Sequence, residues 1–290
     1  MGWLASSHMH ALSRWLRCLL VAVAGLAAGV APGVAAAEPN AQPAAIAPPG
    51  GPAQAWLVAD TVTGRILGGR DPYGRYAPAS TIKPLLAMVV LDQLRPDAAA
   101  RANQSHTDVE CSCVGLVPGQ VYTVRQLLDG LLLVSGNDAA NMLADMLGGY
   151  QVALAKMNAK AFQVGARSTR ANSPSGLDGP GWESVSSPHD LAVLYRTALN
   201  YPLLVQIMHQ RAATFPDGRG GWRTISNQDR LLADYPGFIG GKTGYTNLAR
   251  ETYVAMAQRN GKRLVAVMMY SQDDLWNQAR AALDWGFSQP

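Results

Sequence analysis

The stretch PASTIK at residues 78–83 opens an apolar run that extends to Leu94. The spacing of its apolar residues predicts a helix over residues 80–94, in which Pro84 is tolerated because it falls in the first turn. Residues three apart lie on one face of a helix, so the hydroxyl of Ser80 and the amine of Lys83 are expected to meet. A serine needs a neighbouring base to act as a nucleophile, and a lysine serves as that base only when burial or another cation lowers its pKa.

Two further short motifs lie downstream. Ser135-Gly136-Asn137 interrupts the apolar spacing of residues 124–147, which predicts a break between two helices where side chains face a cleft. Lys242-Thr243-Gly244 lies in a glycine-rich stretch at residues 235–245, which predicts a strand that a substrate backbone can approach closely. The chain has 5 lysines, and two of them fall inside these motifs.

The remaining periodicity predicts mixed α/β structure. A hairpin is expected over residues 55–67, and two strands joined by the tight turn Asn260-Gly261 are expected over residues 251–257 and 263–270. Strands therefore occupy both ends of the chain. This order predicts an antiparallel sheet built from both chain ends, flanked by helices, with a helical insert subdomain. Further helices are expected over residues 150–164, 189–199 and 273–285.

Composition narrows the classes of protein. The chain has 290 residues, of which 48% are hydrophobic and 15% charged, so it has enough apolar material for a sizeable core and is not disordered. One long apolar stretch excludes a protein with several membrane spans. A net charge of +4 is too weak to argue for a nucleic-acid partner.

The first 37 residues predict an export signal. Arg14 and Arg17 precede an apolar stretch at residues 18–31, and the small residues at 35–37 supply a cleavage site after Ala37. An uncleaved anchor is the alternative, but glycine and proline interrupt the run. A lipoprotein cut at Cys18 is disfavoured because Arg17 stands where a small residue is needed.

The predicted organisation follows from this signal. Residues 38–52 are rich in proline and alanine and predict a linker, and residues 53–290 form one catalytic domain. We expect an exported protein of the periplasm, cell wall or extracellular space, with no membrane span in its mature form.

Cys111 and Cys113 lie in a stretch that also holds His106, Asp108 and Glu110. Three states of the cysteines are open. A disulfide is favoured because the protein is expected to be exported, two free thiols come next, and a metal site lacks a recognised ligand spacing. The sequence gives this segment no catalytic role and implies no metal or organic cofactor.

The order S-x-x-K, S-x-N, K-T-G and the flanks of each motif resemble one family. The chain resembles low-molecular-mass penicillin-binding proteins that are serine-type D-alanyl-D-alanine carboxypeptidases, in the short form without a C-terminal β-domain. The resemblance covers residues 55–288 and implies the serine β-lactamase/DD-peptidase-like fold. It is carried by PASTIK at 78–83, LLLVSGNDAA at 131–140, NSPSGL at 172–177, where Ser175 replaces the usual threonine, and GGKTGYT at 240–246.

The resemblance also implies a role for each site residue. Gly244 and Tyr245 belong to the substrate-binding strand, and the backbone N–H groups of Ser80 and Tyr245 form the oxyanion hole. Ser80 forms the acyl-enzyme, Lys83 takes its proton, Ser135 relays that proton, Asn137 holds a substrate amide, Lys242 supplies positive charge, and Thr243 binds the terminal carboxylate.

The implied substrates are peptidoglycan stem peptides ending in D-Ala-D-Ala, with β-lactams as inhibitors. Some relatives carry an arginine just after the strand that here ends near Gln272, and this chain has none there. Carboxylate recognition then falls to Arg250 or Arg230, or to Thr243 and Lys242 alone.

Other functions are weighed against this one. A serine β-lactamase usually has a Glu followed by Asn before the third motif, and residues 183–187 lack that Asn. A glutaminase-type amidase and a non-catalytic penicillin-binding sensor fit the flanks and the complete motifs less well. A DD-endopeptidase or transpeptidase on the same fold stays open.

Overall fold

The computed structural model describes residues 49–290 of the protein. The predicted export signal at residues 1–37, and residues 38–48 of the predicted linker, lie outside the described residues. Among the described residues, no helix combines the length and the hydropathy that a membrane span requires.

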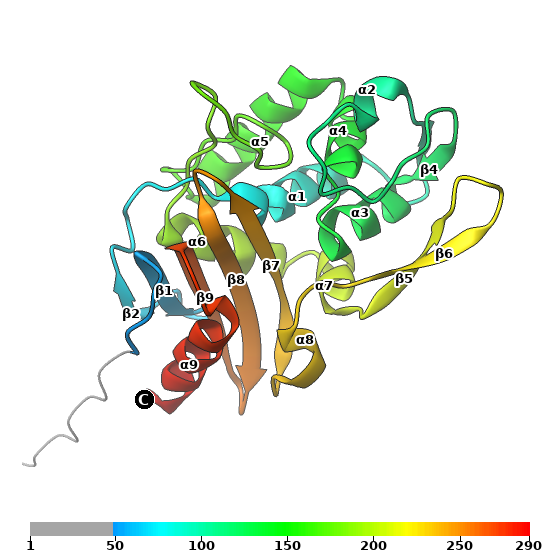
Figure 1. Ribbon diagram of the computed structural model, residues 1–290. Coiled ribbons are helices and arrows are strands. Elements are labelled where there is room, and N and C mark those ends of the chain that lie inside the picture. Colours follow the sequence, from blue (N-terminus) through cyan, green and yellow to red (C-terminus); the bar gives the residue numbers. More distant parts are fainter. Residues whose placement is uncertain (1–48) are drawn as a thin grey trace, which may run out of the picture. The chain divides into compact units, whose positions relative to one another are not determined.

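A five-stranded antiparallel sheet forms the centre of the described part, in the order β2-β1-β9-β8-β7 (Figure 1). Within residues 49–290, the first strand pairs with the last one, so the sheet is built from both ends of this part of the chain, as the sequence predicts. Two small two-stranded sheets lie apart from it. The strands are Ala55–Asp60 (β1), Ile66–Arg70 (β2), Ala99–Arg101 (β3), Val121–Thr123 (β4), Ala212–Pro216 (β5), Trp222–Ser226 (β6), Phe238–Thr246 (β7), Arg250–Arg259 (β8) and Lys262–Ser271 (β9).

Alternation along the central strands creates two cores. On β8, Val254 and Met256 face one core while Tyr253 and Ala255 face the other, because successive side chains of a strand point to opposite faces. Helix α9 (Leu275–Ser288) packs on the second face, against β1, β8 and β9 (Figure 1). Helix α6 (Pro188–Ala198) packs on the first face. The sheet is therefore covered on both sides.

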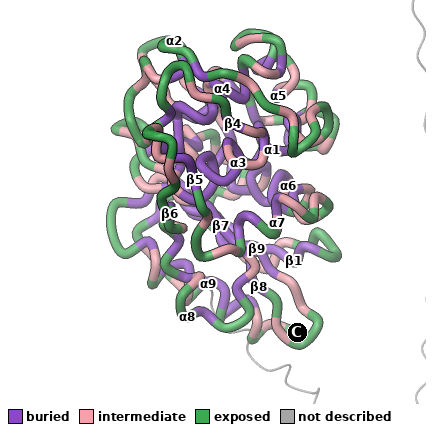
Figure 2. The backbone as a smooth tube through the Cα atoms, turned by 90° about the vertical axis from the view of Figure 1, so that its right-hand side faces the viewer, coloured by how far each residue is buried: buried purple, intermediate pink, exposed green. Residues whose placement is uncertain are grey.

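The helical part of the chain surrounds one buried helix, α1 (Lys83–Gln93), whose residues 83–90 are all buried. It contacts helices on several sides as well as the nucleophile turn η1 (Ala79–Ile82). In Figure 2 the buried residues concentrate in this region and in the sheet. The remaining helices are Gln104–Thr107 (α2), Val124–Leu133 (α3), Asn137–Met146 (α4), Tyr150–Val164 (α5), Pro202–His209 (α7) and Leu231–Asp234 (α8).

The structure confirms most of the predicted elements and corrects one. The predicted helix over residues 80–94 begins as the 3₁₀ turn η1, and Pro84 lies at the start of α1. The β5–β6 hairpin was not predicted, because its strands are short and largely exposed, so they lack an alternating apolar pattern. Asn260 and Gly261 both adopt positive φ angles in the turn between β8 and β9, as the Asn-Gly pair predicts.

Candidate active site

Ser80 lies in a backbone turn that the fold holds in a strained conformation. The preceding residue, Ala79, has a φ of +47°, in the left-handed region that non-glycine residues rarely adopt. The hydroxyls of Thr81 and Thr252 both donate to the Pro78 carbonyl, at 2.6 and 3.0 Å. The buried hydroxyl of Tyr195 donates to the Thr81 carbonyl at 3.0 Å. These contacts fix the turn that presents Ser80.

The NSPSGL segment at residues 172–177 packs against this turn. Gly176 has a φ of +86°, and a Cβ there would lie 1.9 Å from the Ala79 carbonyl oxygen. Only glycine combines that backbone conformation with so close an approach. The segment that the sequence singled out by resemblance therefore packs directly on the nucleophile turn, and its Gly176 and Leu177 line the same cavity as Ser80.

The first two motifs meet at the amine of Lys83. Its Nζ lies 2.6 Å from Ser80 Oγ, 3.2 Å from Ser135 Oγ and 2.7 Å from Asn137 Oδ1. Lys83 is completely buried. The structure thus brings together all four residues that the sequence predicts as catalytic.

Ser135 and Asn137 are placed by the break between helices α3 and α4. Ser135 has a φ of +62°, which ends α3 and turns its hydroxyl toward Lys83. Asn137 is the first residue of α4, and it is almost completely buried. The predicted helix–break–helix pattern is confirmed, and the break is what directs both side chains inward.

The third motif lies on β7 and faces the nucleophile. A Cβ on Gly244 would lie 2.7 Å from the backbone nitrogen of Ser80, so the absence of a side chain lets this strand approach that N–H group. Thr243, Gly244 and Tyr245 line the same cavity as Ser80. Lys242 is buried, and its Nζ donates to the Thr243 carbonyl at 2.7 Å.

Electrostatics separate the two buried lysines. Burial lowers the pKa of Lys83 well below its ordinary value, the neighbouring cation of Lys242 lowers it further, and the charge of Asp138 opposes this. Burial lowers the pKa of Lys242 to about 8, and Asp229 opposes that change. Lys83 therefore loses its proton before Lys242 does.

The cavity at Ser80 has a volume of about 520 Å³, which suits a short peptide. Of the two arginines considered for carboxylate recognition, Arg230 lines this cavity, with its guanidinium 5.5 Å from the ring centre of Trp276. Arg250 lines a separate groove beside Tyr245. Leu177 of the NSPSGL segment also lines the cavity, and sequence reasoning missed several other lining residues, which are Glu110, Ser112, Gln228, Glu251, Leu275 and Trp276.

Two buried aspartates near the lysines were also missed. Asp138 accepts backbone hydrogen bonds from residues 114–116, and Asp229 accepts a hydrogen bond from the hydroxyl of Tyr253 at 2.7 Å. Burial raises the pKa of Asp229 to about 6. The position of Asp138 directly after the S-x-N motif was a usable signal, whereas nothing local marks Asp229.

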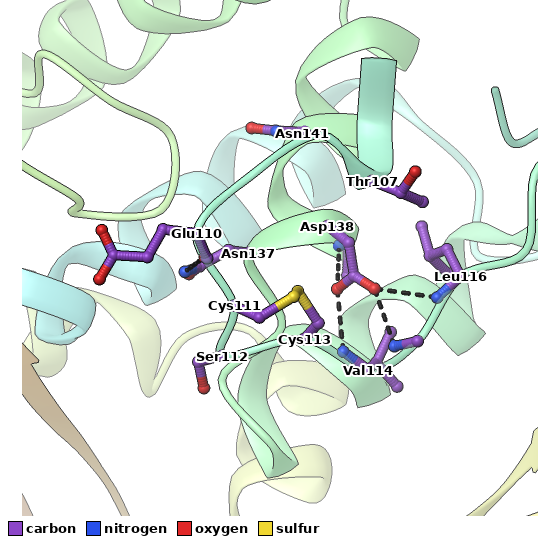
Figure 3. Close-up of a disulfide and its surroundings, with 12 residues drawn as sticks. Thr107, Glu110, Cys111, Ser112, Cys113, Val114, Leu116, Asn137, Asp138 and Asn141 are labelled. Carbon is purple, nitrogen blue, oxygen red and sulfur yellow. Dashed lines mark hydrogen bonds between the residues drawn. A yellow bond between two sulfur atoms is a disulfide. The ribbon is translucent and has the colours of Figure 1, made fainter. Parts of the chain in front are cut away.

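Cys111 and Cys113 form a disulfide, which the sequence favoured over two thiols or a metal site (Figure 3). Within residues 49–290, no group of three or more His, Cys, Asp or Glu side chains is arranged to hold a metal ion.

Comparison with known proteins gives consistent matches. The profile of the D-alanyl-D-alanine carboxypeptidase family matches residues 42–273. The chain is 54% identical over 257 residues to D-alanyl-D-alanine carboxypeptidase DacB2 of Mycobacterium tuberculosis H37Rv, covering 87% of this chain and 88% of that protein. The crystal structure of a D-alanyl-D-alanine carboxypeptidase from M. tuberculosis H37Rv matches with a TM-score of 0.83 and 53% identity, covering 87% and 97% of the two chains. The crystal structure of the Streptomyces K15 DD-transpeptidase matches with a TM-score of 0.79 and 29% identity, covering 84% and 100%.

Proposed function

The chain belongs to the D-alanyl-D-alanine carboxypeptidase family, and we propose that it removes the terminal D-alanine of peptidoglycan stem peptides through an acyl-enzyme on Ser80. One observation carries the proposal. A completely buried lysine amine lies within hydrogen-bond distance of Ser80 Oγ, Ser135 Oγ and Asn137 Oδ1.

The hydrogen-bond capacity of a neutral amine fits these three partners. A neutral Lys83 has two N–H donors and one lone pair. The donors serve Asn137 Oδ1 and Ser135 Oγ, and the lone pair accepts the Ser80 hydroxyl proton. Ser80 Oγ then attacks the carbonyl carbon between the two D-alanines as its proton moves to Lys83 Nζ. Because burial and Lys242 lower the pKa of Lys83 well below its ordinary value, more of Lys83 is present as the free base than of a solvent-exposed lysine.

The oxyanion formed in this step lies between β7 and the nucleophile turn. The N–H groups of Ser80 and Tyr245 are its proposed donors, and Gly244 leaves the space between them open. When the intermediate collapses, the proton on Lys83 passes through the Ser135 hydroxyl to the nitrogen of the departing D-alanine. Water then attacks the acyl carbon as one of its protons moves to Lys83, and that proton passes to Ser80 Oγ when the ester bond breaks and the shortened peptide leaves.

The terminal carboxylate needs a cationic or hydroxyl partner in the cavity. Thr243 and Arg230 line the same cavity as Ser80, while Arg250 does not, so we assign the carboxylate to Thr243 and Arg230. Replacing Arg230 with leucine is expected to raise KM for a peptide with a free C-terminal carboxylate and to leave the value for the amidated peptide unchanged. The matched Arg250→Leu variant is expected to leave both values unchanged. Equal effects of the two substitutions would contradict the assignment.

The role of Asn137 follows from its position. Its side chain lies beside Lys83 and lines the cavity, and we assign it a substrate backbone amide as the family resemblance implies.

Glu183, the acid considered for β-lactamase activity, does not line the cavity, and its carboxylate accepts a hydrogen bond from the Gly181 N–H at 3.1 Å. This arrangement favours slow deacylation of β-lactam adducts, so we propose that β-lactams inhibit the enzyme.

The cellular location is also a proposal. The charged and apolar pattern of residues 1–37 and the disulfide of residues 111 and 113 both fit a protein that is exported and folds in an oxidising compartment. Detection of the protein outside the cytoplasm, with its new N-terminus at Glu38, is the expected result. An intact N-terminus in the exported protein would contradict cleavage after Ala37.

Intact-mass spectrometry after mixing with benzylpenicillin tests the acyl-enzyme. A long-lived adduct that is absent from the Ser80→Ala variant supports it. No adduct with intact drug would refute it, and no adduct with consumed drug would indicate a β-lactamase.

A second candidate activity, DD-transpeptidation, is favoured by the match to the Streptomyces K15 DD-transpeptidase. Release of D-alanine from a D-Ala-D-Ala peptide, with and without glycine as acceptor, separates hydrolysis from transfer.

A further inference from the structure

The loop between α2 and β4 carries the Cys111–Cys113 disulfide to the edge of the active site. Glu110, Cys111 and Ser112 line the same cavity as Ser80. Figure 3 shows the disulfide beside the start of α4, with Asn137 and Asp138 turned toward the loop. A segment with no assigned role in the chemistry therefore lies against the residues that surround the nucleophile.

Ser112, the residue enclosed by the disulfide ring, braces both sides of the second motif. Its hydroxyl donates to the Val134 carbonyl at 3.2 Å, one residue before Ser135. Its carbonyl accepts the backbone N–H of Asn137 at 2.6 Å. The ring thus fixes a residue that bonds just before and just after the break between α3 and α4.

The loop also sets the orientation of the Asn137 amide. The Glu110 carbonyl accepts a hydrogen bond from Asn137 Nδ2 at 2.7 Å, which leaves Oδ1 facing Lys83 Nζ, also at 2.7 Å. The opposite orientation would place two N–H donors against an amine whose own donors need an acceptor. Glu110 therefore decides which end of the Asn137 amide faces Lys83, while Ser112 holds the Asn137 backbone.

Residues 108–116 contain no helix or strand, so no regular ladder holds Glu110 and Ser112 in place. Beyond the ring, the backbone N–H groups of Val114, Gly115 and Leu116 donate to the Asp138 carboxylate at 2.8–2.9 Å. These bonds anchor the downstream side alone. The covalent ring is what limits the backbone freedom of the part that contacts Asn137, because a cross-link removes conformations that the open chain would sample.

We propose that the Cys111–Cys113 disulfide is a positioning element of the active site, and that its reduction slows acylation. With the disulfide intact, Ser112 and Glu110 hold Asn137 Oδ1 toward Lys83. With it reduced, the loop samples conformations in which these two carbonyls no longer meet Asn137. The inference rests on the proposed acyl-enzyme chemistry of Ser80.

The reduction is a thiol–disulfide exchange with a dithiol. A thiolate of the reagent attacks one sulfur, the S–S bond breaks, and a mixed disulfide forms with one reagent sulfur. The second reagent thiolate then displaces the protein sulfur. The reagent ends as a cyclic disulfide, and its two thiol protons pass to Cys111 and Cys113, so two electrons move in total. Cys111 is exposed and Cys113 half-buried, which gives the reagent access.

The test compares the second-order rate of acylation by a fluorescent penicillin in the oxidised and reduced protein, after the dithiol is removed under anaerobic conditions. Alkylation of the thiols and intact mass establish the redox state. We expect reduction to lower the rate about tenfold, which corresponds to a hydrogen bond of about 1.4 kcal/mol that is no longer held. Reoxidation is expected to restore the rate. The melting temperature of the reduced protein is measured alongside, so that the assay temperature can be set where the reduced protein is folded.

Two variants separate positioning from a general structural effect. The Cys111→Ser/Cys113→Ser variant should show the lowered rate and no response to the dithiol. In an Asn137→Ala background, which is already slow, reduction should cause no further loss, because the two changes act through one contact.

The outcomes are distinguishable. Equal rates in both redox forms of the wild-type protein would overturn the positioning role and leave the acyl-enzyme intact. A further tenfold loss on reduction of the Asn137→Ala variant would overturn the route through Asn137. No adduct in the oxidised wild-type protein would refute the acyl-enzyme itself, and the inference with it. The wild-type comparison needs no variant, so the test stands even when the serine substitutions fail to fold.

Discussion

Replacing Asp229 with asparagine is predicted to stabilise the protein, by an amount that depends on pH. Asp229 is 8% exposed, and its Oδ1 accepts hydrogen bonds from the Tyr253 hydroxyl at 2.7 Å and from the Leu231 N–H at 3.0 Å. Its Oδ2 has no hydrogen-bond partner among the described residues and packs against the backbone of Gly241. Asparagine keeps an oxygen for both donors and removes the buried charge.

The magnitude follows from the pKa of the carboxyl. Burial raises the pKa of Asp229 from 3.8 to about 6, even with the hydrogen bonds and the Lys242 cation acting in the other direction. Because the folded pKa is the higher one, the stability that comes from binding this proton is fully present below pH 3.8. It is lost as the pH rises through about 6. A pKa difference of about two corresponds to about 3 kcal/mol. Asparagine never ionises, so it avoids that loss.

Urea denaturation of both proteins from pH 4.5 to pH 8 measures the effect. The asparagine variant should exceed the wild type in free energy of unfolding by about 1 kcal/mol at pH 4.5 and about 3 kcal/mol at pH 7 and above. Asp234→Asn is the matched control. It alters an exposed carboxylate that pairs with Arg280, so its effect should stay within about 1 kcal/mol at every pH. A gap that is the same at pH 4.5 and pH 7.5, or a less stable variant at pH 7.5, would refute the reasoning.

Three further outcomes concern acylation. Lys83→Arg should lower the acylation rate about 10²- to 10⁴-fold, because arginine keeps its proton, and a normal rate in a penicillin assay would exclude Lys83 as the base. In a plot of acylation rate against pH, the alkaline decline should have its midpoint near the pKa of Lys242, about 8. Asp229→Asn should move that midpoint to lower pH, because Asp229 raises the pKa of Lys242. Identical profiles would contradict the coupling between Asp229 and Lys242. Gly244→Ala should slow acylation about 10²-fold, because its Cβ would lie 2.7 Å from the Ser80 nitrogen, and an adduct formed at the wild-type rate would show that the strand gives way.

The parts of the fold and site that the sequence predicts are those fixed by local spacing. Ser80 and Lys83 meet because they are three apart in one helical turn, and this needs no tertiary information. Asn260-Gly261 fixes the turn between the last two strands for the same reason. The strands near the two chain ends are apolar on both faces, and the pairing of β1 with β9 places them at the centre of a sheet that is covered on both sides.

The features that escaped prediction depend on partners far apart in the chain. Asp229 is defined by Tyr253 and by the backbone of β7, and Asp138 by N–H groups more than twenty residues earlier. The left-handed conformation of Ala79 is held by hydroxyls of residues 195 and 252 around its turn. No local propensity records such contacts, because the same short sequences would be unstrained and unpaired elsewhere.

The two buried lysines lose their protons in a fixed order because their neighbouring charges differ. Lys83 and Lys242 have the same chemistry, and burial lowers the pKa of both. Lys242 has Asp229 as its counter-charge, which opposes the effect of burial on its pKa. Lys83 faces the Lys242 cation, and the carboxylate that opposes it, Asp138, already shares its charge with three backbone N–H groups. The proton therefore leaves Lys83 first. Because those N–H groups belong to the disulfide loop, that loop contacts both side chains that act on the base, the amide of Asn137 and the carboxylate of Asp138.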